Sequence, residues 1–297
     1  MANPQPVISP VLWAVTEKHP PAELRQKKET MKLFIATAAA AMALLAPVSA
    51  LADPFRPGVK DQIDLGKRAA DKVRKEQKVL PDTDPRVMEM RRIGAKLIAL
   101  IPEKERKDRP FQYSFDVVED KELNAFALPG GPIFFNSGLL DKLSTEDQVA
   151  GILAHEITHV RNQHWASAYA DNSKRQLGIT AILLIIGAGN TAFDVAGVAD
   201  AVIFSLPYSR KHETEADNVG FDLATAAGYN PQGMVDTFKI LKAGAGGKKT
   251  EEWISTHPDT DKRIANLEKK VKDSGKTYPN QRPRAVPAKY KPPVKQK

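Results

Sequence analysis

Three side chains of one short segment, His155, Glu156 and His159, have the types and spacing needed to bind and use a metal ion. At about 100° per residue in an α-helix, His159 lies about 40° around the axis from His155, so both imidazoles project to one side. Two imidazoles in this arrangement can bind one zinc ion, and a glutamate beside them can take a proton from water. The pattern indicates metal-assisted hydrolysis, with Glu156 as the candidate general base.

The residues around this motif predict a buried helix from about 145 to 170. Thr145 and Gln148 form a capping box at its start. Apolar residues then occupy much of its surface: Ile152, Leu153, Ile157 and Val160. The alternative is an amphipathic helix with two incidental histidines. Because unpaired polar groups are costly in a buried helix, a metal ion that supplies their partners is the favoured interpretation.

A third protein ligand is expected from the segment 209–217, because a catalytic zinc ion usually has three protein ligands and one open position. Glu213 and Asp217 are four residues apart and share a helix face. Glu213 is the candidate ligand, and Asp217 is the candidate partner that orients a ligating imidazole. His212 and Glu215 remain rivals for the third position, since spacing alone does not exclude them.

The composition excludes several other chemistries. The 297 residues include no cysteine, which excludes a cysteine zinc site, a thiolate nucleophile and a disulfide scaffold. The formal charge of +8 raises the question of nucleic acid, but residues 53–275 carry 32 basic against 33 acidic side chains. The excess lies in 276–297, which has seven basic residues, five prolines and no acid. We expect a mobile, disordered tail that contacts anionic membrane peripherally, and no nucleic-acid partner.

The N-terminal residues indicate export. Met31-Lys32, an apolar run over 33–46 and small residues up to Ala52 have the order of a secretory signal peptide over 31–52. An uncleaved anchor is the alternative. Residues 1–30 are polar and proline-rich, so we expect them to be disordered and upstream of the true start at Met31. A periplasmic protein is therefore predicted, with its metal-binding domain over 53–275.

Hydrophobic periodicity and turn residues outline the remaining elements. They predict two helices within 60–101, a strand at 111–118, a hairpin or bent edge strand formed by 124–128 and 133–136, a buried helical hairpin at 177–206, helices at 209–227, 231–241 and 259–273, and a flexible break at 244–247. The fold class expected is α+β and mainly helical, with a small antiparallel sheet.

Four ordered blocks of the chain resemble the HtpX and CAAX prenyl protease family of zinc metallopeptidases, above all its periplasmic, BepA-like branch. They are Asn124–Leu140, His155–Val160, Tyr208–Asp217, and Thr256-His257-Pro258 with Arg263-Ile264. The resemblance implies a zincin-like domain with one zinc ion on His155, His159 and Glu213. The segment after 275 does not resemble the helical repeats of that branch, so docking to its partners is not carried over.

The resemblance also implies a place for substrate. Asn124, Ala125, Phe126 and Ala127 resemble a family edge strand beside the zinc. An extended substrate chain would add to such an edge by main-chain hydrogen bonds. This would suit a peptidase that acts on unfolded segments.

The sequence leaves the roles of several further residues open. His257 matches a family histidine that shapes the active site or holds it latent, and a surface-loop histidine is the alternative. His257, Arg263 and Tyr208 are unranked candidates for stabilising a tetrahedral oxyanion. His164 lies one residue out of helical register with His159 and is expected to be structural.

The function expected is zinc-dependent endoproteolysis of misfolded or unfolded exported proteins, in envelope quality control. One alternative is a periplasmic chaperone or binding module with structural zinc and no proteolysis. Another is a membrane-embedded peptidase, which would require residues 179–204 to insert.

Overall fold

The computed structural model describes residues 53–185, 208–244, 255–258 and 260–286 of the chain. The predicted signal segment, the residues before it and the break at 245–247 lie outside this part. So does the part of the predicted hairpin at 177–206 that follows Ile185. Within the described ranges, no helix combines the length and apolar character needed to cross a bilayer.

The sheet is small and mixed. It consists of β1 (Ser114–Val118), β3 (Pro132–Asn136) and β2 (Ala125–Ala127), in that spatial order. β2 pairs antiparallel with β3, as the predicted hairpin requires, but β1 pairs parallel with β3. The expectation of a purely antiparallel sheet is therefore wrong. The chain reverses direction between β1 and β2 and reverses again between β2 and β3. β3 therefore runs in the same direction as β1, and it pairs with β1 because it lies between β1 and β2.

The predicted pair of N-terminal helices is confirmed as α2 (Val59–Glu76) and α3 (Pro85–Ile98). Asp84 caps α3 by accepting a hydrogen bond from the backbone N–H of Arg86 at 2.9 Å. Two short helices were not predicted: α4 (Glu103–Asp108) and α5 (Ser137–Leu140). Neither has the length over which hydrophobic periodicity becomes visible.

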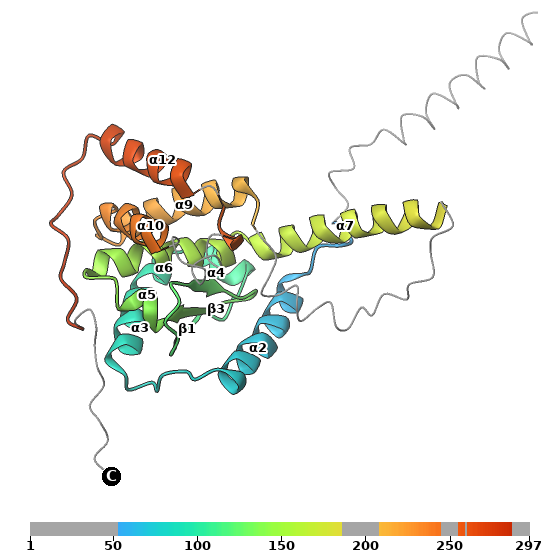
Figure 1. Ribbon diagram of the computed structural model, residues 1–297, viewed down its shortest axis with the longest axis horizontal. Coiled ribbons are helices and arrows are strands. Elements are labelled where there is room, and N and C mark those ends of the chain that lie inside the picture. Colours follow the sequence, from blue (N-terminus) through green and yellow to red (C-terminus); the bar gives the residue numbers. More distant parts are fainter. Residues whose placement is uncertain (1–52, 186–207, 245–254, 259, 287–297) are drawn as a thin grey trace, which may run out of the picture. The chain divides into compact units, whose positions relative to one another are not determined.

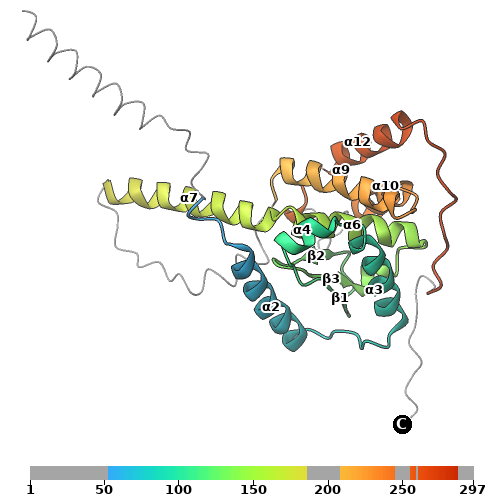
Figure 2. The same ribbon diagram turned by 180° about the vertical axis from the view of Figure 1, so that it is seen from behind.

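The central element is α6 (Glu146–Arg161), which carries the His-Glu motif. The predicted capping box is present, with Thr145 accepting from the backbone N–H of Gln148 at 3.2 Å. Every residue from 147 to 160 is buried. The helix lies between the sheet and the pair α9 (Arg210–Ala226) and α10 (Gln232–Gly244), with α12 (Thr260–Asp273) packed beyond them (Figures 1 and 2). This burial on all sides explains why α6 lacks a polar face.

The expected single helix over 145–170 is two helices. α6 ends at Arg161, and α7 (His164–Ile185) begins after a break at Gln163, whose φ is 55°. A left-handed residue cannot continue a right-handed helix, so the chain changes direction there. The residues on either side of Gln163 include no glycine or proline that would have indicated this break.

The expectation of a mobile tail is wrong for residues 276–286, which lie along the domain. Arg284 is only 8% exposed and pairs with Glu89 of α3 at 2.6 Å. The backbone N–H of Arg282 donates to the side chain of Asp147 at 2.6 Å, and the Arg282 carbonyl accepts from the backbone N–H of Glu146 at 2.8 Å. These specific contacts offset the low apolar content of the segment. Residues 287–297 lie outside the described part.

Candidate metal centre

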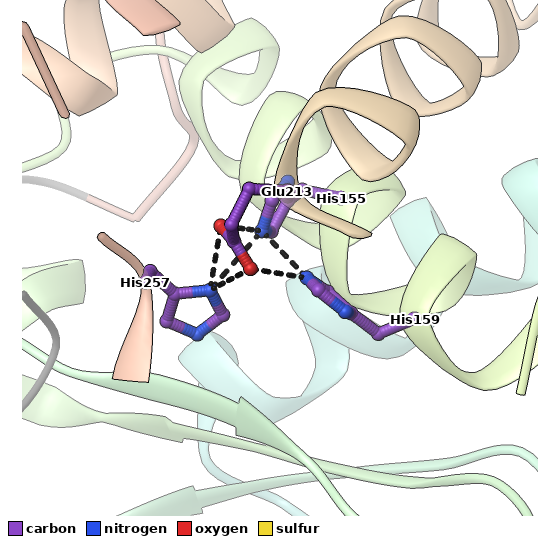
Figure 3. Close-up of side chains that lie close together, drawn as sticks. All are labelled: His155, His159, Glu213 and His257. Carbon is purple, nitrogen blue, oxygen red and sulfur yellow. Dashed lines mark hydrogen bonds and ion pairs between the residues drawn. The ribbon is translucent and has the colours of Figure 1, made fainter. Parts of the chain in front are cut away.

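Four side chains from three segments bring metal-binding atoms together in the interior. His155 and His159 come from α6, Glu213 from α9, and His257 from the segment 255–258 (Figure 3). One donor atom of each lies within 4.8 Å of the others. All four residues are buried, with at most 2% of any of them exposed.

The separations suit one tetrahedral ion. Nε2 of His155 and Nε2 of His159 lie 3.0 Å apart. Oε1 of Glu213 is 3.4 Å from Nε2 of His159, and Oε2 is 3.6 Å from Nε2 of His155. Ligands about 2.0–2.1 Å from a tetrahedral zinc ion lie about 3.3 Å from one another. The donor geometry therefore fits a tetrahedral divalent cation.

The protonation states also suit a metal. Burial lowers the pKa of His155 and lowers that of His159 well below its usual value, so both rings are neutral. Burial opposes ionisation of Glu213, but the charges of His257 and Arg263 outweigh it and lower the pKa of this carboxyl. Neutral imidazoles and an ionised carboxylate are the forms that bind metal.

Glu156 lies beside these donors without taking part in their cluster. It is completely buried, and neither carboxylate oxygen has a well-formed hydrogen bond to a described residue. Its nearest ion-pair contact is Nε2 of His257, at 3.8 Å. Burial, with the charge of Glu213, raises the pKa of Glu156 to about 7, against the opposing effect of His257. A carboxyl group in this state can both accept and release a proton near neutral pH.

Arg263 of α12 connects the two acidic residues of α9. Its Nη1 lies 2.6 Å from Oε2 of Glu213, while Nε and Nη2 donate to Asp217 at 2.8 and 2.7 Å. The cation outweighs the burial of Asp217 and lowers the pKa of that carboxyl to about 2. Asp217 in turn contacts Nδ1 of His155 at 3.1 Å. The sequence offered Arg263 as a candidate for stabilising the oxyanion. In the structure its guanidinium faces carboxylates and holds the Glu213 and Asp217 side chains in place.

His257 and Tyr208 both lie at the cluster. Nδ1 of His257 is 3.1 and 3.2 Å from the two oxygens of Glu213 and 3.4 Å from Nε2 of His155. The alternative of a surface-loop histidine is therefore wrong. The ring of Tyr208 stacks on His159 with centroids 3.9 Å apart, and its backbone N–H donates to the carbonyl of Thr256 at 3.2 Å.

The rivals for the third ligand position lie outside the cluster. His212 stacks on His164 instead, with ring centroids 4.7 Å apart, and the side chain of Glu215 is 44% exposed. His164, expected to be structural, has its Nδ1 only 3.0 Å from Nδ1 of His159. No sequence signal pointed to this contact, because it depends on the break at Gln163.

The predicted substrate strand is an edge of the described sheet and borders α6. Asn124 accepts from Asn136 at 2.9 Å, and Leu128 donates to Pro132 at 2.8 Å, both toward β3. Because antiparallel pairing alternates, the backbone groups of Ala125 and Ala127 point away from β3. They lie on the side of β2 that could receive another strand.

This mainly helical α+β fold, with its buried His-His-Glu-His cluster, is typical of zincins. The model of peptidase family M48 matches residues 87–271, and the chain belongs to this family. The expectation of a metallopeptidase family is confirmed at that level.

Its relatives include proteins of two kinds. The chain is 30% identical over 217 residues to the mitochondrial metalloendopeptidase OMA1 of Schizosaccharomyces pombe, covering 69% of this chain and 61% of that protein. It is 32% identical over 167 residues to the beta-barrel assembly-enhancing protease of Escherichia coli (strain K12), covering 52% of this chain and 33% of that protein. The chain thus spans less than two thirds of the length of either relative.

Proposed function

We propose that this chain is a zinc-dependent endopeptidase that hydrolyses unfolded or misfolded exported proteins. The observation that carries the proposal is the convergence of His155, His159 and Glu213 beside the buried Glu156, whose carboxylate oxygens have no hydrogen-bond partner among the described residues. Family M48 membership and similarity to two metalloproteases support the reaction class.

His155, His159 and Glu213 would hold the zinc ion. When bound, zinc supplies Lewis acidity that polarises the substrate carbonyl and lowers the pKa of a water molecule. Glu156 would accept a proton from the attacking water on a carboxylate oxygen and then deliver it to the leaving amide nitrogen. Burial suits Glu156 to this cycle, since it brings the pKa of the carboxyl to about 7.

We propose that the substrate adds to β2 as an extended strand. The outward backbone groups of Ala125 and Ala127 would pair with the substrate backbone, which places no demand on its side chains. The backbone of Ala127 also lies close enough to Glu156 to influence its pKa. A peptide bond bound at this edge would therefore lie near the general base. This mode favours unfolded segments over folded proteins.

The compartment is also a proposal. The signal-like segment 31–52 and the similarity to a bacterial beta-barrel assembly-enhancing protease support a periplasmic location and a BepA-like assignment. A role in envelope quality control would follow from both. The similarity to the mitochondrial metalloendopeptidase OMA1 supports the reaction class but gives no support for a periplasmic location.

One observation favours a second candidate function. His257 adds a fourth protein donor, and four protein donors are typical of structural zinc sites. A chaperone with structural zinc would bind unfolded chains without cutting them. The wild-type protein and the Glu156→Gln variant would then protect unfolded chains from aggregation equally well.

Cleavage of casein by the purified protein tests the proposal. We expect about one zinc ion per chain and cleavage that a chelator stops. Glu156→Gln should retain zinc but lose at least about a hundredfold in rate, the usual contribution of a general acid–base. Glu119→Gln, an exposed glutamate, is the matched control. Full activity without metal, or in Glu156→Gln, would refute the proposal. The Glu156→Gln protein would also serve to trap physiological substrates.

A further inference from the structure

The two histidines of α6 have different partners on their outer nitrogens. Nδ1 of His155 contacts the carboxylate of Asp217 at 3.1 Å. Nδ1 of His159 contacts no carboxylate of a described residue; it lies 3.0 Å from Nδ1 of His164. Ligating histidines almost always donate this second N–H to a carboxylate, a backbone carbonyl or water. His164 occupies the place where such a partner is needed.

The direction of this hydrogen bond follows from the chemistry of the ring. If His159 binds metal through Nε2, its only proton is on Nδ1, so Nδ1 donates. Nδ1 of His164 must then accept, which leaves the proton of a neutral His164 on Nε2. Oε2 of Glu215 lies 3.4 Å from that Nε2, and Asn162 holds the other oxygen of Glu215 by donating at 2.6 Å. The tautomers of the two histidines are therefore consistent along the whole chain of contacts.

The backbone is shaped to make this contact. In an uninterrupted helix, His164 would lie five residues beyond His159, about 140° away around the axis. The break at Gln163 turns the chain so that His164 returns to His159. Gln163 is the only non-glycine residue with positive φ in the described ranges, and Gln62 of α2 donates to its side chain at 2.9 Å. Unfavourable backbone geometry that neighbours hold in place is often associated with a functional site.

The surroundings of His164 also restrict its ring. The residue is only 2% exposed, and the ring of His212 stacks on it at 4.7 Å between centroids. It makes an edge contact with the ring of His159, at 4.9 Å. The imidazole of His164 is thus fixed in the orientation that its hydrogen bond to His159 requires.

We propose that His164 is a positioning residue for the metal ligand His159. It accepts the Nδ1–H of His159, fixes the tautomer and rotation of that ring, and so presents the Nε2 lone pair to the metal. The inference rests on the proposed zinc site, and it assigns to one ligand an imidazole partner where the other ligand has a carboxylate.

Zinc affinity of three variants tests this role, measured on purified protein by competition with a chromophoric chelator. His164→Phe keeps a planar ring but no acceptor, and it should weaken zinc binding by about 10–100-fold, the usual cost of losing an outer-shell partner. His164→Asn places an amide oxygen near the former Nδ1 position and should recover most of the affinity. His212→Phe, the same exchange in the stacked neighbour, should leave it within about twofold of wild type.

The absorption spectrum of cobalt-substituted protein gives a second readout, because it reports ligand geometry around the metal. His164→Phe should alter this spectrum, and His212→Phe should not. Circular dichroism and thermal unfolding of the metal-free variants will show whether each is folded. A folded His164→Phe with wild-type zinc affinity would refute the inference, as would equal losses in His164→Phe and His164→Asn.

Both measurements are made without substrate, so they separate this inference from the proposed function. Wild-type protein that binds zinc and cleaves no peptide would refute the peptidase proposal alone. Equal zinc affinity in wild type and His164→Phe would refute the positioning role alone.

Discussion

Nδ1 of His155 lies 3.1 Å from Oδ1 of Asp217, although the two residues are on different helices, α6 and α9. Arg263 of α12 fixes the carboxylate from the other side through two hydrogen bonds. This contact orients the His155 ring so that Nε2 faces Glu213 and His159. Three helices must therefore pack correctly before the first ligand is in position.

Asp217→Asn should weaken zinc binding by about tenfold or more, because the amide keeps the size of the side chain but loses the charge that supports His155. Competition with a chelator measures the change. Asp222→Asn is the matched control, since Asp222 is on the same helix and its side chain is 71% exposed. Equal zinc affinities in the two variants would contradict the orienting role of Asp217.

His257→Ala should separate two effects. Zinc affinity should fall at least about tenfold, because a donor 3.1–3.4 Å from Glu213 and His155 is lost. The turnover number on casein at saturating zinc should rise several-fold, because the position that a water molecule needs becomes open. His212→Phe, which keeps a ring stacked on His164, is the control. A variant that binds zinc normally but is inactive would instead give His257 a catalytic role.

Gly151→Ala tests the packing of α10 on α6. A Cβ at Gly151 would lie 2.6 Å from the Cα of Met234, closer than atoms of this kind approach, so the helices must separate. We expect a loss of about 1–3 kcal/mol in the free energy of unfolding, measured by urea denaturation. The sign of the change in the free energy of unfolding is diagnostic, because a glycine-to-alanine exchange in an uncrowded helix interior stabilises the protein by about 1 kcal/mol. A more stable variant would show that the helices can adjust.

Arg284→Met tests the packed C-terminal segment. Removing the cation leaves Glu89 buried without its ion-pair partner, and such losses cost about 3–5 kcal/mol. The thermal unfolding midpoint should fall accordingly. Lys276→Met, at an exposed position, is the control. A chain ending at Val286 should match the wild type in stability, and one ending at Gly275 should not. Equal stability of both truncations would favour the mobile tail.

Most helices could be predicted because their signals are local. The periodicity of apolar residues, the capping box at Thr145 and the prolines at 81, 85 and 102 define the helices with errors of a few residues. His155, Glu156 and His159 followed from spacing within one helix. Glu213 was the candidate from its spacing to Asp217, with His212 and Glu215 left as rivals, and the structure places Glu213 with the two histidines.

Other features could not be predicted because they depend on residues far apart in the chain. The parallel pairing of β1 with β3 depends on which strand of the hairpin lies next to β1, and here that strand is β3. The order of 276–286 depends on Glu89, almost 200 residues earlier. The break at Gln163 depends in part on Gln62. None of these partners leaves a signal in the local sequence.

The sequence by itself determined the chemistry available: two imidazoles and a carboxylate on one helix, a second acidic helix, and no thiol. These properties follow from residue type and helical period, which act over a few residues. Only the tertiary structure decided which atoms meet. It selected Glu213 over His212 and Glu215, added the Nδ1 of His257, and brought His164 against His159. The physical reason is that a metal site requires donor atoms within a few ångströms of one point, and the packing of α6, α9, α12 and the segment 255–258 sets those distances.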